Sequence, residues 1–209
     1  MKTAHAPLAD PMKILTRTEM ATVLADLRRK AMRSPSTRLN LVIFRLAACC
    51  GLRASEIAKL RVEDVHESLP RPHLRIQAGA AKGGRPRYVP LWWDAGTLAD
   101  IAAWATTRRD DGALADDPLV ASLRPGREGT ALSRHTLRKR FRTACKVLGP
   151  ERLKTLTIHH GRHTFISHAL AGGRTLAEVR DAAGHANVSV TSGYLHVAVD
   201  THELGTLFG

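Results

Sequence analysis

The sequence lacks the features of a membrane or secreted protein. It contains no run of about eighteen apolar residues, which is the length that a membrane-spanning helix needs. The first residues, MKTAHAPLADPMK, lack the apolar core of a secretory signal peptide. We therefore expect a cytoplasmic protein that has no membrane partner.

Cysteine is scarce as well. The cysteines are Cys49, Cys50 and Cys145, and no two of them form a Cys-x-x-Cys pair, which argues against zinc or dithiol redox chemistry. We expect these thiols to be reduced and mostly buried. Carboxylates do not cluster near the motifs described below, so the sequence predicts neither a magnesium site nor any other cofactor.

Acidic residues are also few. The sequence has 19 Asp and Glu residues against 32 Lys and Arg residues, which gives a formal net charge of +13. Such an excess of positive charge predicts a polyanionic partner. Because no lipidation signal or isolated lysine-rich amphipathic helix points to an anionic membrane, nucleic acid is the favoured partner.

What the sequence does contain is the pattern of one mainly helical domain. We expect a flexible, polar tail over residues 1–14, and a single domain over residues 15–209. Apolar residues recur at helical spacing in several segments of this domain. The predicted helical segments are 15–32, 38–50, 56–60, 97–109, 133–149, 159–173 and 175–185.

Local signals mark the ends of these helices and the connections between them. TRTE at 16–19 and TLAE at 175–178 have the spacing of a capping box. Gly51 is the expected left-handed cap of the second helix, and Ser55 is the expected N-cap of the third. Residues 110–129 combine acids, proline and glycine, so we expect a surface loop.

A small sheet is predicted where the hydrophobic period changes. Residues 73–77 and 87–91 are extended runs, and the glycine-rich segment between them predicts a hairpin-like connection. Lys82 lies in that connection. A lysine in such a turn is ordinarily solvated, so by itself it indicates no chemistry.

Four short motifs carry residues that are unusual in combination. Each has an ordinary explanation by itself, such as an ion pair, a solvated turn, a contact at i and i+3 on one helix, or a buried tyrosine. Only the combination points to chemistry. The motifs are GLRASE with Arg53 and Glu56, AKGGRPRYVPL with Lys82, HHGRH with His159 and Arg162, and Gly184-His185 followed nine positions later by Tyr194.

In order and spacing these motifs resemble the catalytic domain of the tyrosine recombinases, the phage integrase family. The flanks LRASEIAKL, RPRYVPL, HTFISHAL and LHV strengthen the resemblance, which runs from about residue 15 to the C-terminus. It implies a mainly α fold with a small three-stranded antiparallel sheet, and site-specific DNA recombination through a 3′-phosphotyrosyl intermediate without a cofactor. The implied catalytic residues are Arg53, Lys82, His159, Arg162, His185 and Tyr194, with Glu56 in support.

The resemblance assigns the arginines to the scissile phosphate. Arg53 and Arg162 would hold its non-bridging oxygens, and Glu56 would orient Arg53. Elementary chemistry agrees, because nucleophilic attack on a phosphodiester places negative charge on those oxygens, and a guanidinium meets them with a planar, permanently charged fork.

The resemblance makes Tyr194 the nucleophile. A tyrosine with an ordinary pKa of about 10 is protonated at neutral pH, so it needs positive surroundings and a nearby base. His159 could accept the proton and His185 could donate to the phosphate, while Lys82 would protonate the leaving 5′-oxygen. The phosphotyrosyl ester would store the broken bond until another strand's 5′-hydroxyl reseals it.

The sequence departs from the family pattern at two places. Gly161 stands where the family usually has a bulky apolar residue, and glycine near a helix start costs stability and could loosen Arg162. No room exists before residue 15 for the helical core-binding domain that most members carry, so the chain is either a naturally short member or a fragment.

The segment 133–149 is strongly basic on one side. We expect its basic side chains to contact double-stranded DNA, mainly at phosphates, with arginines also able to read guanine edges. These residues are Arg134, Arg138, Lys139 and Arg142. The resemblance further implies a tetramer on the DNA recombination sites, weak association or a monomer without DNA, accessory DNA-bending proteins as partners, and docking of residues 203–209 on a neighbouring subunit.

Three other interpretations compete with recombination. A type IB topoisomerase uses a similar set of residues and the same phosphotyrosine chemistry to relax DNA. A DNA-binding regulator could keep the fold without the chemistry, although the catalytic positions hold the expected residue types. His159 and His163 lie at i and i+4, as in a metal site, but no glutamate or clear third ligand accompanies them.

Overall fold

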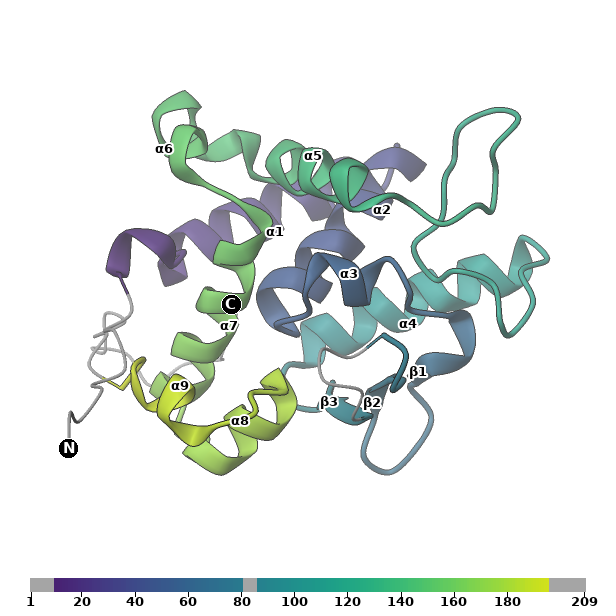
Figure 1. The fold of residues 1–209 in the computed structure, drawn as a ribbon. Helices are drawn as coiled ribbons and strands as arrows, with labels where there is room; N and C mark the ends of the chain where they lie inside the picture. The colour runs from purple at the N-terminus through teal and green to yellow at the C-terminus, as the bar shows by residue number, and fades with distance from the viewer. Residues whose placement is uncertain (1–9, 81–85, 196–209) are drawn as a thin grey trace.

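The computed structural model describes residues 10–80 and 86–195, and its elements confirm the predicted mainly α fold with a small antiparallel sheet (Figure 1). Lys82 and the segment 203–209 lie outside the described residues, as do residues 1–9 of the predicted tail. The α-helices are α1 (Arg17–Ala31), α2 (Pro35–Phe44), α3 (Ala54–Ile57), α4 (Ala95–Asp110), α5 (Arg134–Ala144), α6 (Pro150–Thr155), α7 (Ile158–Ala171), α8 (Leu176–Ala183) and α9 (Val188–Ser192).

Shorter elements complete the chain. The 3-10 helices are η1 (Pro11–Lys13), η3 (Val62–Asp64) and η4 (Cys145–Leu148), the π-helix is η2 (Arg45–Cys49), and the strands are β1 (Val65–His66), β2 (His73–Ile76) and β3 (Arg87–Pro90). No helix in the described part of the chain is long and apolar enough to cross a membrane.

The helices surround a single core, to which α7 contributes many buried residues. In Figure 1, α1, α2 and α5 lie together in the upper part, while α7 descends from them towards α8 and α9. α7 packs on η2, α2 packs on both α1 and α5, and α8 packs on β3. Cys49, Cys50 and Cys145 are buried in this core as free thiols, as predicted.

Several helix boundaries follow from the local signals in the sequence. The predicted capping boxes are present at the start of α1, with Thr16 and Glu19, and at the start of α8, with Thr175 and Glu178. Gly51 adopts the predicted left-handed conformation, with φ of +66°, where the buried helix ends. Each interaction joins residues close in the chain, which is why the sequence predicts it well.

The sheet has the order β1-β2-β3 and is antiparallel throughout. Leu74 pairs with Val89, and both side chains are buried. Because strand residues alternate between faces, Arg87 lies on the same buried face as Val89, whereas Tyr88 is exposed. A charged residue on an inward face needs a buried partner, and the partner of Arg87 belongs to the candidate site described below.

The sequence predicted Ser55 as the N-cap of the third helix, and this prediction is wrong. Arg53 is the N-cap of α3, and its backbone N–H donates to Oε2 of Glu56 over 2.8 Å. The Glu56 carboxylate thus takes the place of the capping hydroxyl, which leaves Ser55 inside the helix.

The predicted surface loop 110–129 is partly a core segment. Leu119, Val120 and Ala121 are buried. The backbone N–H of Leu119 donates to Leu60, and Nε1 of Trp104 donates to the Leu119 carbonyl, each over 2.8 Å. Composition alone failed here because these partners lie far away along the chain.

Two short helices complete the described chain. Pro150 begins α6, where its fixed φ and missing N–H suit the first helical position. Residues 186–193 contain α9, whose first turn is capped by the side chain of Asn187.

Gly161 is explained by how closely α7 packs on η2. A Cβ atom at this position would lie 2.9 Å from the carbonyl carbon and 3.0 Å from the Cβ of Ala47. The obstacle includes backbone, so it cannot rotate away. The bulky residue usual at this position has no space here, and glycine lets the helix that carries Arg162 approach the core.

We expect Gly161→Ala to destabilise the protein by about 1–3 kcal/mol because overpacking outweighs the better helix propensity of alanine. Urea unfolding measures the change, and Gly79→Ala serves as the control, because a Cβ there meets nothing within 4 Å. If Gly161→Ala instead stabilised the fold by about 0.5–1 kcal/mol, as at an open helix position, the packing argument would fail.

Candidate active site

Two arginines from distant parts of the chain meet at the junction of three elements. Arg162, on α7, is 6% exposed and donates from Nη1 to the Gly51 carbonyl over 2.7 Å and from Nη2 to the Ala183 carbonyl over 2.5 Å. Arg53, at the start of α3, donates from Nη2 to the Gly184 carbonyl over 3.4 Å. The left-handed turn at Gly51 and the end of α8 therefore hold both guanidiniums in place.

A buried carboxylate anchors this arrangement. Glu56 is 1% exposed, and its Oε1 accepts from Nη1 of Arg53 over 2.9 Å. Arg87 donates to both oxygens of Glu56, from Nη1 and Nη2, over 2.9 Å each. Nε of Arg87 donates to the Ala182 carbonyl over 2.9 Å. One carboxylate therefore connects β3 and the last turn of α8 to Arg53.

Sequence reasoning missed Arg87. A signal was present, since the alternation in RPRYVPL places this arginine on the same face as the apolar Val89. Its partner Glu56 lies 31 positions earlier, so the spacing alone could not identify the pair.

The site carries more positive than negative charge. The pKa of Arg162 is lowered to about 9, first by burial and then by the charges of Arg53 and Arg87, which Glu56 only partly offsets. An anion bound between the two donors would reverse the unfavourable electrostatics, because an opposite charge favours the protonated guanidinium. The electrostatics of the site therefore favour an anion such as a phosphate.

His159 and His185 border these arginines. Burial lowers the pKa of His159, followed by the charges of Arg162, Arg138 and Arg53. The pKa of His185 is lowered to about 4, mainly by burial and further by the positive charges of Arg162, Arg53 and Arg87. Nδ1 of His185 and Oγ1 of Thr191 are 2.9 Å apart in a hydrogen bond. His185 is therefore neutral at neutral pH and is fixed by α9.

Tyr194 follows α9 and turns its hydroxyl towards α7. The hydroxyl forms a hydrogen bond with Nδ1 of His163, and the two rings are stacked with centroids 5.7 Å apart. Burial raises the pKa of Tyr194, and the positive charge of Arg162 opposes that rise. The sequence pointed to His159 as the acceptor of this proton, whereas the hydrogen bond is made by His163, one helical turn further along.

His163 entered the sequence analysis only as a metal-ligand alternative with His159. Within residues 10–80 and 86–195, no group of three or more His, Cys, Asp or Glu side chains could hold a metal ion. The position of His163 beside Tyr194 depends on how α9 folds back on α8 and α7, so the sequence pattern could not have predicted it.

The basic helix α5 turns its charged side to solvent. Its apolar residues Leu137, Phe141 and Ala144 are buried. α5 packs on α7, which carries His159 and Arg162, and on α3, whose N-cap is Arg53. The four predicted DNA contacts, Arg134, Arg138, Lys139 and Arg142, are all exposed.

Arg140 behaves differently from these four. It donates to the amide oxygen of Asn40 over 2.8 Å and to Ser36, so it joins α5 to α2.

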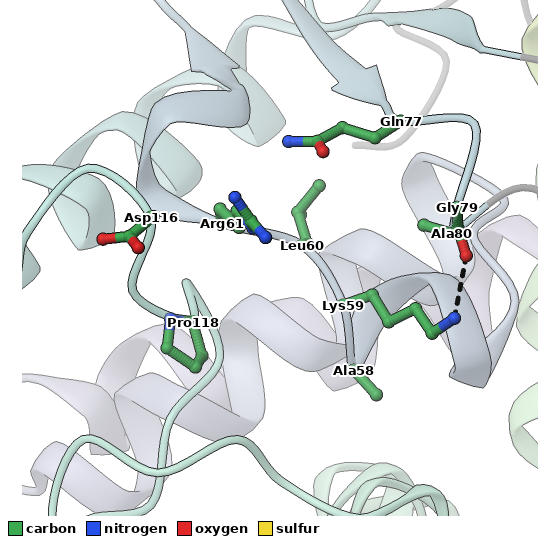
Figure 2. A pocket seen from close by; sticks show the side chains of 9 residues that line it. All are labelled: Ala58, Lys59, Leu60, Arg61, Gln77, Gly79, Ala80, Asp116 and Pro118. Atoms are coloured by element: carbon green, nitrogen blue, oxygen red, sulfur yellow. Dashed lines mark hydrogen bonds between the residues drawn. The ribbon is translucent and has the colours of Figure 1, made fainter.

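A separate hollow of about 370 Å³ lies beside α3 (Figure 2). Its lining includes Arg61, Gln77 and Asp116, and none of the predicted catalytic residues that lie within the described part of the chain. Lys59 reaches across one side, and its Nζ donates to the Gly79 carbonyl over 2.8 Å. This bond ties the chain after β2 to the residues that follow α3, the helix that carries Glu56.

Comparison with known proteins agrees with this geometry. Residues 13–201 match the phage integrase family. The tyrosine recombinase XerC of Chromobacterium violaceum is 34% identical over 169 residues, which cover 79% of this chain and 50% of that protein. The chain spans about half the length of the curated relatives it matches first.

Solved structures share the fold. The crystal structure of XerA recombinase has a TM-score of 0.69 at 20% identity, covering 95% of this chain and 61% of that one. A XerH site-specific recombinase bound to palindromic difH substrate in a post-cleavage complex has a TM-score of 0.68 at 22% identity, covering 94% and 52%.

Proposed function

The chain belongs to the phage integrase family, and we propose that it cleaves and rejoins double-stranded DNA at specific sites through a 3′-phosphotyrosyl intermediate. The observation that carries the proposal is that backbone carbonyls hold the guanidiniums of Arg53 and Arg162, while the hydroxyl of Tyr194 is bonded to His163, the residue that follows Arg162. Relatives named as tyrosine recombinases support it.

In this proposal the two arginines bind the non-bridging oxygens of the scissile phosphate. Their backbone partners at Gly51, Ala183 and Gly184 fix both guanidiniums before DNA arrives. Donors that need no rearrangement stabilise the charge that develops in the transition state more effectively than mobile ones. Lysine would not replace either arginine, because it lacks the planar fork.

Tyr194 attacks the phosphorus, and the bond to the 5′-oxygen breaks. Lys82, by family resemblance, protonates the leaving oxygen, and His159 and His185 donate or accept protons at the phosphate. A 5′-hydroxyl from another strand then attacks the phosphotyrosyl ester and restores a phosphodiester, so neither ATP nor a metal ion is consumed.

A nicked suicide duplex tests this function. Once cleavage releases a short fragment beyond the nick, religation is prevented and the protein stays bound to the 3′-phosphate. We expect a band of protein covalently linked to DNA on a denaturing gel, in the presence of a chelator. Failure to form the adduct on the protein's own site would favour a DNA-binding regulator, and relaxation of plasmid without strand exchange would favour a topoisomerase.

The assembly belongs to the same proposal. We expect double-stranded recombination sites as partners, a tetramer on two paired sites and weak association without DNA. Residues 203–209 are the proposed contact with a neighbouring subunit, and accessory DNA-bending proteins are further proposed partners.

DNA binding should depend steeply on salt, because each phosphate contact contributes about −0.9 to the log-log slope of affinity against salt concentration. The double variant Arg138→Ala/Lys139→Ala removes two exposed charges of α5, so we expect the slope to fall in magnitude by about 2. Fluorescence anisotropy over a salt series measures it. Arg29→Ala is the control, since this exposed arginine is already paired with Asp26, and an equal loss in both variants would show that α5 is not the DNA surface.

A further inference from the structure

His163 contacts the reacting atom of the proposed nucleophile. Its Nδ1 and the hydroxyl of Tyr194 form a hydrogen bond, and the two rings stack at an interplanar angle of 28°. Both side chains are half-buried. When Nδ1 of His163 is unprotonated, such a contact fixes the tyrosine hydroxyl in one direction and gives its proton one destination.

The helix explains why this histidine is so well placed. His159, Arg162 and His163 lie at i, i+3 and i+4 on α7, and residues with these spacings share one face of a helix. The same face that presents Arg162 to the site therefore presents His163 to Tyr194.

The other two histidines have different neighbours. Nδ1 of His185 is hydrogen-bonded to Thr191, and the arginines Arg162, Arg138 and Arg53 act on His159. The described contacts therefore join His163, and neither of these two histidines, to the hydroxyl of Tyr194.

We infer that His163 is a further catalytic residue, which accepts the proton of Tyr194 during the attack on DNA. The inference rests on the proposed function. As the bond from the tyrosine oxygen to phosphorus forms, the O–H electron pair stays on the oxygen and the proton moves to Nδ1 of His163. The bond to the 5′-oxygen breaks, and that oxygen takes its proton from the acid on the leaving side. In resealing, His163 returns its proton to Tyr194.

The electrostatics keep His163 ready to accept. The pKa of His163 is lowered to about 4, mainly by burial and further by the charges of His160, His159, Arg162 and Lys13. The ring is therefore neutral at neutral pH. The other titratable groups that face it are Tyr194 and His185. A phosphate between the arginines adds negative charge, which favours a protonated imidazole. Binding of DNA thus strengthens the base at the moment when it is needed.

Substitution of His163 by asparagine separates proton transfer from positioning. The asparagine side chain places an oxygen near the position of Nδ1, so it can still accept a hydrogen bond from Tyr194, but it cannot take the proton. In single-turnover cleavage of the nicked suicide duplex at pH 7, we expect His163→Asn to form the adduct about 10²–10⁴-fold more slowly than the wild type. The defect should shrink as pH rises towards the pKa of Tyr194, because solvent base then removes the proton.

A modified duplex shows whether His163→Asn impairs removal of the Tyr194 proton or protonation of the leaving oxygen. If sulfur replaces the scissile 5′-oxygen, the thiolate leaves without needing an acid, so a defect on the leaving side is relieved. We expect His163→Asn to remain slow on this duplex. His160→Asn is the matched control, because His160 accepts from the backbone N–H of Thr157 through Nδ1 and an asparagine oxygen can take over that bond, so it should cleave like the wild type.

Each outcome decides one proposal. If the wild type forms no adduct, the proposed function is wrong. If the wild type forms it and His163→Asn matches the wild-type rate within about threefold at pH 7, or is rescued by the sulfur duplex, the inference about His163 is wrong. Anisotropy with the same DNA and thermal unfolding confirm that the variant binds and folds, and His163→Gln provides a second slow variant if His163→Asn is unstable.

Discussion

Tyr194→Phe should abolish the covalent adduct with a nicked suicide duplex and leave DNA affinity within about twofold. The substitution removes one oxygen, which is the proposed nucleophile, and keeps the ring that stacks on His163. The loss should be about 10⁴-fold or more, because the substitution removes the proposed nucleophile itself. Adduct formation on denaturing gels and anisotropy binding curves measure the two effects.

The chain offers an exact control for this experiment. Its other tyrosine, Tyr88, is 63% exposed on β3 and turns away from the buried face that carries Arg87. Tyr88→Phe should therefore form the adduct at the wild-type rate. If Tyr194→Phe still reacted, or if Tyr88→Phe lost the reaction, the nucleophile would be another residue.

Glu56→Gln should be the most destabilising conservative change in the site. It keeps the shape of the side chain but leaves Arg87, which is 9% exposed, and Arg53 without their negative partner. Removing one member of a buried ion pair costs about 3–5 kcal/mol. Urea unfolding at pH 7 measures the loss, and Glu63→Gln is the control, because its partners Arg61 and Arg75 are solvent-exposed and such pairs contribute about 0–1 kcal/mol.

The ion pair between Glu56 and Arg87 also predicts that stability depends on pH. Burial raises the pKa of Glu56, but hydrogen bonds and charge from Arg87, helped by Arg53, outweigh it, so the pKa in the folded protein lies below its ordinary value of 4.5. A lowered pKa means that the stabilisation is complete above the unfolded pKa and is lost as pH falls through the folded pKa. The free energies of unfolding of the wild type and of Glu56→Gln should therefore become more similar below about pH 4. A constant difference down to pH 2 would contradict the ion-pair argument.

Arg87 shows why the site is larger than its motifs. The sequence indicates Arg53 and Glu56 because they lie three positions apart, at the spacing of a helical turn. Arg87 binds Glu56 through a contact between residues 31 positions apart, and Ala182 completes it from α8. Such contacts exist only once the sheet and α8 have packed on α3, so no local pattern contains them.

By itself, the sequence determined the features that depend on neighbours along the chain. The capping boxes of α1 and α8, the left-handed turn at Gly51 and the charged face of α5 arise from interactions within about one helical turn or from residue type alone. The family motifs belong here too, since residue type and spacing carry them.

Only the tertiary structure decided which of these residues touch. It buried residues 119–121 of an apparent surface loop, and it made Gly161 necessary by pressing α7 against Ala47. It also placed His163, rather than His159, on the hydroxyl of Tyr194. The physical reason is the same in each case: close packing joins segments that are distant in the chain, and the free energy of those contacts is absent from any short window of sequence.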